Sequence, residues 1–387
     1  MPELDSLRGI AILLVLFFHG FNLPAVTSHL RGLPRLFVGA TLGGWTGVYL
    51  FFVLSGFLIT GILLDSKSKP NYYRRFYIRR ALRILPAFYL LLLLLSILPR
   101  TGWLDGRRVG WPFIVLSFFY LANMASLFHI PSQYTVLWSL AVEEHFYLLW
   151  PTAVRRFSQR VLMWSALALC IICPVLRGWA FWLGDKSAGG YTWLVADSLA
   201  IGALLPLLSR GPLAHRGPMR RFSLAALFGG CALLAALTPF GIWRGVTFCG
   251  WVFRLTAINL LCTGILGLTL LAGTSRWRWL VQRPVLRFFG EISYGLYLIH
   301  MLASDFVDHW MIHFFPAYTV RLTQNFDLVA FRFLINSAFA VGVAYFSRRY
   351  FEEAFLRLKD RWAPSTAKSS AQAIAYPAAS RPARQTA

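Results

Sequence analysis

The sequence predicts an all-α fold: a polytopic transmembrane helical bundle of about ten spans, with both termini in the cytoplasm. Three observations predict it. Of the 387 residues, 57% are hydrophobic and 14% are charged, with a mean hydropathy of +0.58, whereas a soluble domain is about half apolar and a quarter charged. The apolar residues form blocks of about 20, the length at which a helix crosses a bilayer. Most Lys and Arg residues lie in the short loops between these blocks.

Ten apolar blocks are long enough to span the membrane as helices. They cover residues 9–23, 44–64, 81–98, 135–153, 161–183, 192–209, 222–239, 251–272, 286–312 and 328–347. The further stretch 111–128 is apolar, but it holds Asn123 and lies between Pro112 and Pro131. We expect this stretch to be re-entrant or interfacial rather than a span.

The distribution of basic residues predicts the topology. With ten spans, 27 of the 38 Lys and Arg residues fall on the N-terminal side of the membrane, and an eleventh span would remove this bias. The positive-inside rule then places both termini in the cytoplasm. We therefore expect a multi-pass protein of the cytoplasmic (inner) membrane, with residues 1–350 as its transmembrane domain. Residues 351–387 would form a cytoplasmic tail, disordered beyond 363 because it is rich in Ala, Ser and Pro.

The charge and the cysteines exclude other classes of function. A net charge of +23 is common in proteins that bind nucleic acid, but these charges are explained by topology, and no nucleic-acid partner is expected. The five cysteines fall within or at the edges of apolar blocks. Buried packing accounts for them better than a redox or metal role, so the expected metal content is none.

The first span contains Arg8 and, eleven residues later, His19. At about 100° per residue the two lie within about 20° of the same helix face, separated by about 16 Å of rise. Taken alone, Arg8 is typical of a topological anchor. An ionisable side chain inside a span is costly and marks a functional site by default, so we expect His19 to be functional.

The densest basic cluster is RRFYIRRALRILP, residues 74–86. A cytoplasmic loop that fixes topology explains its charge, and contact with anionic lipid head groups is an alternative. Neither explains why Arg80 and Arg83 lie so close to the apolar run. Arginines there can fork onto phosphates.

Two further spans carry polar groups on one face. In LWSLAVEEHFYLLWP, residues 137–151, Ser139, Glu143 and Tyr147 share a face, and Glu143 is followed by two more titratable residues. An inward-facing carboxylate beside a histidine predicts acid–base chemistry, with a helix-packing ion pair as the structural alternative. In FFGEISYGLYLIH, residues 288–300, hydroxyl residues precede His300. Such hydroxyls can simply join helices, whereas His300 is expected to be functional for the same reason as His19.

The predicted topology places these groups at two depths. His19, Glu143 and His300 fall in the outer half of the bilayer, and the arginines of the first and third spans fall at the inner face. This arrangement suits a donor with phosphates at the cytoplasmic face and a reactive end deep in the membrane.

The chain resembles the acyltransferase 3 family of membrane-bound acyltransferases. The resemblance is carried by LDSLRGIAILLVLFFH, YLFFVLSGFLIT, FYIRRALRILP, LWSLAVEEHFYLLWP and FGEISYGLYLIH, in this order, and covers about residues 3–350. The family's R-x10-H pair matches Arg8 and His19, and its R-x-x-R matches Arg80 and Arg83. Its remaining motifs match Trp138, Ser139, Leu140 and Glu143, and then Ser293, Tyr294, Tyr297 and His300. The chain departs from the family at His145, where relatives often have Gln, and in FEEAFLRLK, which lacks the usual Glu-x-Pro turn.

The resemblance implies O-acyl transfer. Acyl-CoA, with acetyl-CoA expected, would be a donor substrate reached from the cytoplasm, with no bound cofactor. The acceptor would be a hydroxyl of a polysaccharide, a lipid-linked sugar or a glycoside, and membrane lipids would be the remaining partners. Arg8, Arg80 and Arg83 would hold the CoA phosphates, and His19 would act as general base, oriented or charged by Glu143. An acyl-histidine intermediate remains an alternative. The supporting or substrate-binding residues would be Asp5, Trp138, Ser139, Ser293, Tyr294, Tyr297 and His300.

Two other functions fit part of the pattern. A transporter or a lipid or glycolipid flippase without covalent chemistry also carries inward-facing His and Glu, and internal pseudo-symmetry would favour it; the sequence shows no repeat. A non-catalytic membrane scaffold would not need titratable groups aligned at one depth.

Overall fold

A computed structural model describes residues 1–22, 30–102, 109–185, 188–210, 216–271, 279, 281–315 and 325–362, and these ranges contain helices but no strand. The first helices are α1 (Pro2–Phe21), α3 (Gly32–Thr41), η1 (Leu42–Trp45), α4 (Thr46–Ser66), α5 (Tyr72–Ile97), η2 (Leu98–Arg100), α6 (Trp111–Phe118), η3 (Ala122–Phe128) and α7 (Leu137–Arg156). They are followed by α8 (Gln159–Trp182), η4 (Ala188–Gly190), α9 (Thr192–Ser209), α10 (Arg216–Leu237), α11 (Phe248–Leu271), α13 (Pro284–Phe314), α15 (Phe326–Phe346), η5 (Ser347–Glu352) and α16 (Glu353–Trp362). The predicted all-α class is confirmed.

In the described ranges, ten helices have 18 residues or more, and each overlaps one of the ten predicted spans. Eight segments are long and apolar enough to cross a membrane. Helices α7 and α13 are not among the eight; they carry the polar and charged side chains of two sequence motifs. The fold is therefore a polytopic helical bundle, and the chain is a multi-pass membrane protein.

The stretch 111–128 does not form a spanning helix. It divides into the eight-residue α6 and the 3₁₀ helix η3. At 1.5 Å per residue α6 is about 12 Å long, less than half of the hydrocarbon thickness of about 30 Å. This agrees with the expectation of a re-entrant or interfacial piece.

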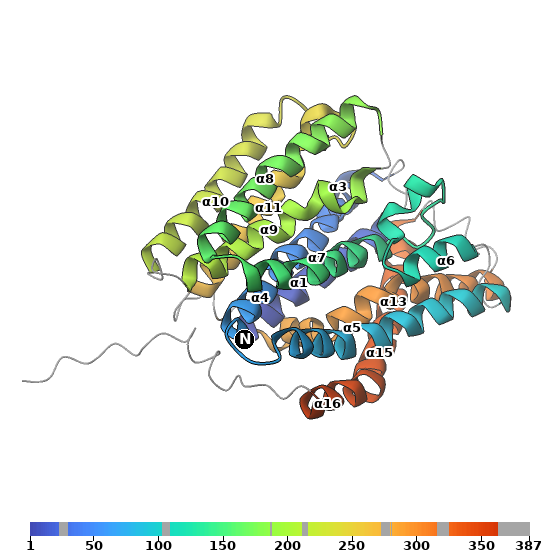
Figure 1. Cartoon of the computed structure of the whole chain (residues 1–387). Helices are drawn as coiled ribbons and strands as arrows, with labels where there is room; N and C mark the ends of the chain where they lie inside the picture. The colour runs from blue at the N-terminus through green and yellow to red at the C-terminus, as the bar shows by residue number, and fades with distance from the viewer. Residues whose placement is uncertain are drawn as a thin grey trace, which may run out of the picture.

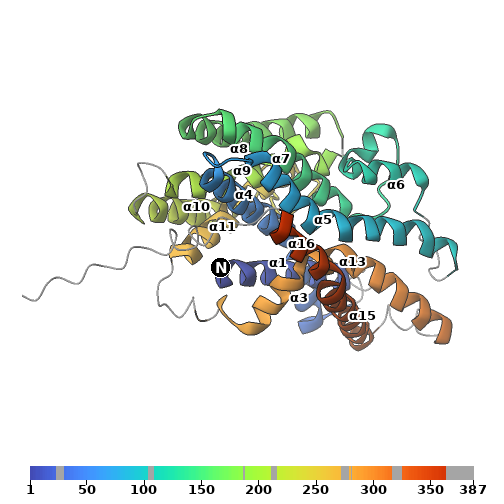
Figure 2. The ribbon, with the colours of Figure 1, turned by 60° about the horizontal axis from the view of Figure 1, so that its bottom comes forward.

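The helices form three groups in Figure 1: α8, α10 and α11 lie on one side, α5, α13 and α15 lie on the other, and α1, α4 and α7 lie between them. Helices α1, α4 and α7 therefore have other helices of the bundle on both sides. At the C-terminal end, α15 continues through the π-helical turn η5 into α16, which packs against α5 (Figure 2). The expected domain boundary at residue 350 lies inside this π turn, and the expected disorder beyond 363 lies outside the described residues.

Two glycines set how closely α1 approaches α13. A Cβ atom at Gly9 would overlap the carbonyl oxygen of Leu286, and a Cβ atom at Gly290 would overlap that of Asp5. Small residues at such crossings let helix backbones meet in a membrane, where packing rather than the hydrophobic effect drives association. The crossing fixes α1 against the helix that carries His300.

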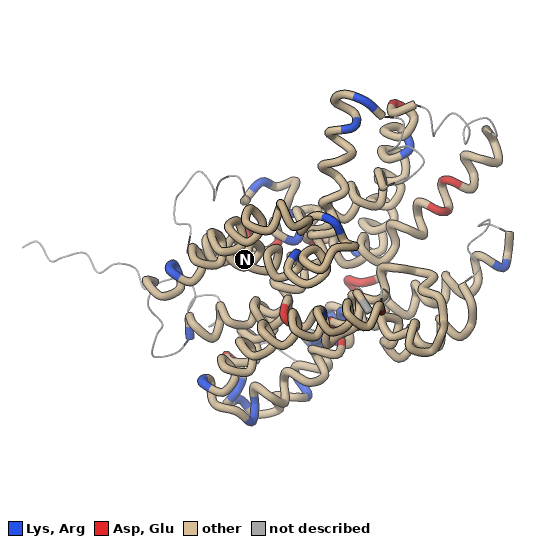
Figure 3. The backbone as a smooth tube through the Cα atoms, turned by 90° about the horizontal axis from the view of Figure 1, so that it is seen from above, with Lys and Arg blue, Asp and Glu red and all other residues tan. Residues whose placement is uncertain are grey.

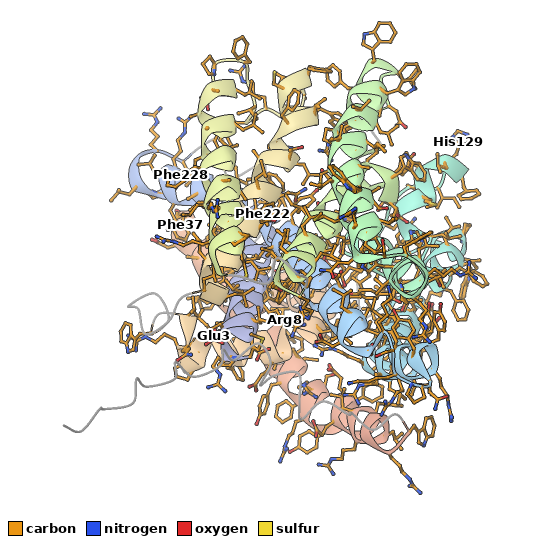
Figure 4. The ribbon with its side chains drawn as sticks, turned by 60° about the vertical axis from the view of Figure 1, so that its left-hand side comes forward. Glu3, Arg8, Phe37, His129, Phe222 and Phe228 are labelled. Carbon is orange, nitrogen blue, oxygen red and sulfur yellow. The ribbon has the colours of Figure 1, made fainter. Side chains whose placement is uncertain are left out.

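The surface of the bundle is apolar, as lipid contact requires. Leu149 on α7 is 69% exposed and Phe228 on α10 is 66% exposed. Lys and Arg positions lie mainly near helix ends (Figure 3). In Figure 4, Phe228 and Phe37 are on outer helices, whereas Arg8 lies within the bundle. The position of Arg8 indicates that part of the interior of the bundle is polar.

Candidate active site

A cavity of about 90 Å³, which we call the arginine cavity, lies where α1, α4, α5, α7 and α13 meet. Its lining residues are Arg8, Val48, Phe51, Phe52, Ser55, Arg80, Arg83, Ile84, Ser139, Leu140, Glu143, Tyr147, Ser293, Tyr294 and Tyr297. All five sequence motifs thus contribute residues to one space. The predicted shared face of Ser139, Glu143 and Tyr147 is confirmed, because all three side chains line the cavity.

The three arginines give this cavity an excess of positive charge. Arg8 Nη1 donates to Asp5 Oδ1 at 3.5 Å, and the Arg80 guanidinium lies 4.7 Å from the centre of the Tyr147 ring. Arg83 is solvent-exposed and lines the cavity, so it marks the mouth. Among the described residues, neither Arg80 nor Arg83 has a carboxylate within salt-bridge distance. These guanidinium groups can therefore bind an anion with several oxygens, such as a phosphate.

Glu143 is held inside the arginine cavity by two hydroxyl groups. Ser55 Oγ donates to Glu143 Oε1 at 2.9 Å, and Tyr147 OH donates to Glu143 Oε2 at 2.9 Å. The sequence interpretation paired Glu143 with His19. The structure instead groups Glu143 with the arginines, because helix position predicts depth in the membrane but not which neighbouring helix a side chain meets.

The remaining motif residues of this cavity join its walls. Ser139 Oγ and Tyr297 OH are 2.6 Å apart, which links α7 to α13. Tyr294 OH donates to the Ile84 carbonyl at 2.8 Å and links α13 to α5, and Ser293 Oγ donates to Gly290 O at 2.8 Å within its own helix. Trp138 packs edge-on against Phe52, with ring centres 5.8 Å apart. These contacts hold the helices that shape the cavity.

His19 and His300 form a direct pair across the α1–α13 contact. His19 Nδ1 lies 3.0 Å from the Val15 carbonyl and 3.3 Å from His300 Nε2. His300 Nδ1 lies 2.9 Å from the Tyr297 carbonyl. Because a carbonyl only accepts, both Nδ1 atoms carry the hydrogen. His300 Nε2 then accepts from His19 Nδ1–H, and His19 Nε2 keeps a free lone pair.

A second, smaller space adjoins this pair, and we call it the histidine pocket. It measures about 20 Å³ and is lined by Leu16, His19, Gly20, His300, Ser304, Arg332, Phe333, Asn336, Ser337 and Ala340. A volume of this size holds about one water-sized group. Tyr297 lies between the two spaces: it lines the arginine cavity, and its ring centre lies 6.0 Å from that of His300, which lines the histidine pocket.

The site combines a phosphate-binding group, Arg8, and a candidate general base, His19, about three turns apart on the same helix. One end has guanidinium groups for phosphates, and the other has a neutral imidazole with a free ring nitrogen beside a small pocket. An imidazole held by a hydrogen bond to its other nitrogen is the usual form of a general base.

Sequence reasoning did not identify several residues of these spaces. Ser55 holds Glu143, while Asp308, Arg332 and Asn336 form a hydrogen-bonded cluster at the histidine pocket. Asp308 and Arg332 are charged residues within α13 and α15, a signal that marks function inside a span.

Comparisons with known proteins agree with the motifs. The sequence model of the family described as an acyltransferase domain, acyltransferase 3, matches residues 1–347. The peptidoglycan O-acetyltransferase OatA of Listeria monocytogenes is 29% identical over 327 residues, covering 78% of this chain and 49% of OatA. The putative peptidoglycan O-acetyltransferase YrhL of Bacillus subtilis is 29% identical over 342 residues, covering 78% of this chain and 48% of YrhL.

A putative O-acetyltransferase of Staphylococcus aureus strain MSSA476 is 27% identical over 368 residues, covering 86% of this chain and 56% of the relative. The chain thus spans about half the length of these relatives. No solved structure matches significantly. Because the family model covers nearly all of the helical bundle, the chain belongs to the acyltransferase 3 family of membrane acyltransferases.

Proposed function

We propose that this chain transfers an acetyl group from cytoplasmic acetyl-CoA to a hydroxyl of a carbohydrate or glycoconjugate. The observation that carries the proposal is the placement of the arginine cavity and of the His19–His300 pair on either side of Tyr297. The relatives named as peptidoglycan O-acetyltransferases support both the acetyl group and the carbohydrate acceptor.

The donor would lie along the arginine cavity. Arg8, Arg80 and Arg83 bind the phosphates of CoA through charge-assisted hydrogen bonds. The pantetheine arm extends past Tyr297, and the thioester arrives beside His19. The distance to be covered is about 16 Å, the rise of eleven residues of helix, which suits an extended arm of this kind.

The acceptor would react at the histidine pocket. His19 Nε2 takes the proton of the acceptor hydroxyl, and the oxygen attacks the thioester carbonyl. The C–S bond then breaks, the new ester C–O bond remains, and the CoA thiolate takes the proton back from His19 Nε2. During this step the imidazolium keeps its Nδ1–H bond toward His300 Nε2, so His300 orients and stabilises the base. The small volume of the pocket limits competing attack by water.

The test compares the glycans of three strains by mass spectrometry: one lacking the protein, one with it restored, and one with His19→Ala restored. We expect an acetylated glycan or glycolipid only with the unaltered protein. A non-covalent flippase would redistribute glycans without changing their mass. Identical acyl content in all three strains would therefore contradict the proposal.

A further inference from the structure

The histidine pocket contains a buried hydrogen-bond acceptor that the transfer step does not use. Asn336 on α15 is 5% exposed and lines the pocket beside His19. Its Nδ2 donates to Asp308 Oδ1 at 3.1 Å, while its Oδ1 is buried without a partner among the described residues. A carboxylate only accepts hydrogen bonds, so the amide turns Nδ2 to Asp308 and leaves Oδ1 available to the pocket.

A charged frame holds this amide in place. Arg332 Nε donates to Asp308 Oδ1 at 2.9 Å and Oδ2 at 3.1 Å, so the guanidinium group fixes the orientation of the Asp308 side chain. Arg332 Nη1 also donates to the carbonyl of Gly20 at 3.3 Å, directly after His19 in α1. The frame therefore ties Asn336 to the helix that carries the base, and it fixes the position of Oδ1 relative to His19.

An unpartnered acceptor in such a rigid setting indicates a partner from outside the chain. Buried amide oxygens are rarely left unsatisfied, and doing so is destabilising. The pocket has room for about one water-sized group, which suits a single hydroxyl or amide N–H. The frame itself is neutral, because Asp308 and Arg332 compensate each other, so it favours an uncharged polar ligand.

We propose that the histidine pocket is the acceptor subsite, in which Asn336 Oδ1 accepts a hydrogen bond from a group next to the reacting hydroxyl. This inference rests on the proposed function. It specifies that the acceptor substrate has a second hydrogen-bond donor beside the reacting hydroxyl. This donor is either a neighbouring hydroxyl or an acetamido N–H, which sugars have and simple alcohols lack. Asp308 and Arg332 are positioning residues, because they act through Asn336.

The experiment measures acetyl transfer by the purified full chain in nanodiscs, with acetyl-labelled acetyl-CoA and the N-acetylglucosamine–N-acetylmuramic acid disaccharide as the acceptor probe. Asn336→Leu should raise the KM for the disaccharide about tenfold, the effect of losing one buried hydrogen bond. The KM for acetyl-CoA should not change. The matched control is Asn259→Leu, because Asn259 is another buried asparagine, 1% exposed, on α11 and lines neither space. In this control variant, the KM for the disaccharide and the KM for acetyl-CoA should both stay at the wild-type level.

The outcomes separate this inference from the proposed function. An unchanged disaccharide KM in Asn336→Leu, with His19→Ala inactive, would overturn the role of Asn336 alone. No transfer to the disaccharide by the wild-type chain would overturn the acceptor assignment itself. If the Asn336→Leu protein does not fold, Asn336→Ala takes its place. An equal rise in the KM for the disaccharide and the KM for acetyl-CoA would also overturn the proposed role.

Discussion

At the scale of single residues, the chemistry depends on which nitrogen of His19 is free. Its Nδ1 lies near Val15 O and His300 Nε2, so Nε2 is the atom able to take a proton. Protonation there strengthens the Nδ1–H bond toward His300, because a hydrogen bond from a charged donor is stronger than one from a neutral donor. In the proposed mechanism, His300 thus takes the place that a carboxylate has in many acid–base pairs, without a second charge in the membrane.

The arginine cavity gives a prediction about the donor. Arg80→Ala and Arg83→Ala should each raise the KM for acetyl-CoA by about tenfold or more, because each removes a charge-assisted contact worth about 1.5–3 kcal/mol. The acceptor KM should change little. The measurement is steady-state transfer with each substrate varied in turn.

Arg74→Ala is the matched control for these variants. Arg74 is an exposed arginine on the same helix and does not line the cavity, so its loss should leave the donor KM unchanged. If the Arg74 variant and the Arg83 variant weaken donor use equally, general surface charge explains the effect and the cavity does not.

The motifs identified most of the residues around the two spaces, because an ionisable group in a span is conspicuous in sequence. The partners of these residues were harder to predict. His300 rather than Glu143 meets His19, and this depends on the rotation and crossing of α1 and α13, which helix periodicity does not contain. Asn336 could not be found from sequence, because one asparagine in an apolar helix is typical of helix packing.

At the scale of elements, the α1–α13 contact aligns the two histidines. Gly9 and Gly290 allow the backbones to meet near the N-terminal ends of the two helices. His19 and His300 lie ten residues further along each helix. The equal offset keeps the two rings level with each other.

This contact gives a second prediction. Gly290→Ala should separate the helices, with a cost of about 1–3 kcal/mol for overpacking, and should reduce transfer by more than it reduces membrane insertion. Thermal unfolding and turnover of the purified variant measure the two effects. Gly342→Ala is the control, because a Cβ atom at Gly342 on α15 meets nothing within 4 Å. Wild-type turnover and stability in Gly290→Ala would show that the close contact is not needed.

The long elements were predictable, while the short ones were not. Each apolar block became a helix because about 20 apolar residues in lipid must satisfy their backbone hydrogen bonds internally. The division of 111–128 into α6 and η3, and the continuation of α15 through η5 into α16, depend on local packing. The mean hydropathy of a sequence segment contains no information about such packing.

At the scale of the whole molecule, the proposed mechanism needs a passage from the arginine cavity, where the cytoplasmic donor would bind, to the histidine pocket, where the acceptor would react. This requires the arginine cavity to open toward the side that holds the CoA. The distribution of Lys and Arg along the chain predicts that the termini lie on that side.

The sidedness can be measured directly. A C-terminal epitope tag should be inaccessible to antibody or protease in intact cells and accessible after permeabilisation, because 27 of the 38 Lys and Arg residues lie on the terminal side. A tag placed in the loop around residue 243, on the opposite side, serves as the control and should be accessible without permeabilisation. The reverse pattern would contradict the predicted orientation.

The most direct test of the account is acetyl transfer by purified His19→Ala protein in nanodiscs, with wild type and His300→Ala measured alongside. General-base catalysis contributes about 10²–10⁴ in rate, so His19→Ala should abolish measurable transfer while its membrane insertion and expression stay normal. His300→Ala should retain more activity, because His300 orients the base without taking the substrate proton. Near wild-type turnover in His19→Ala would exclude His19 both as the base and as an acyl-carrying nucleophile, and would contradict the mechanism.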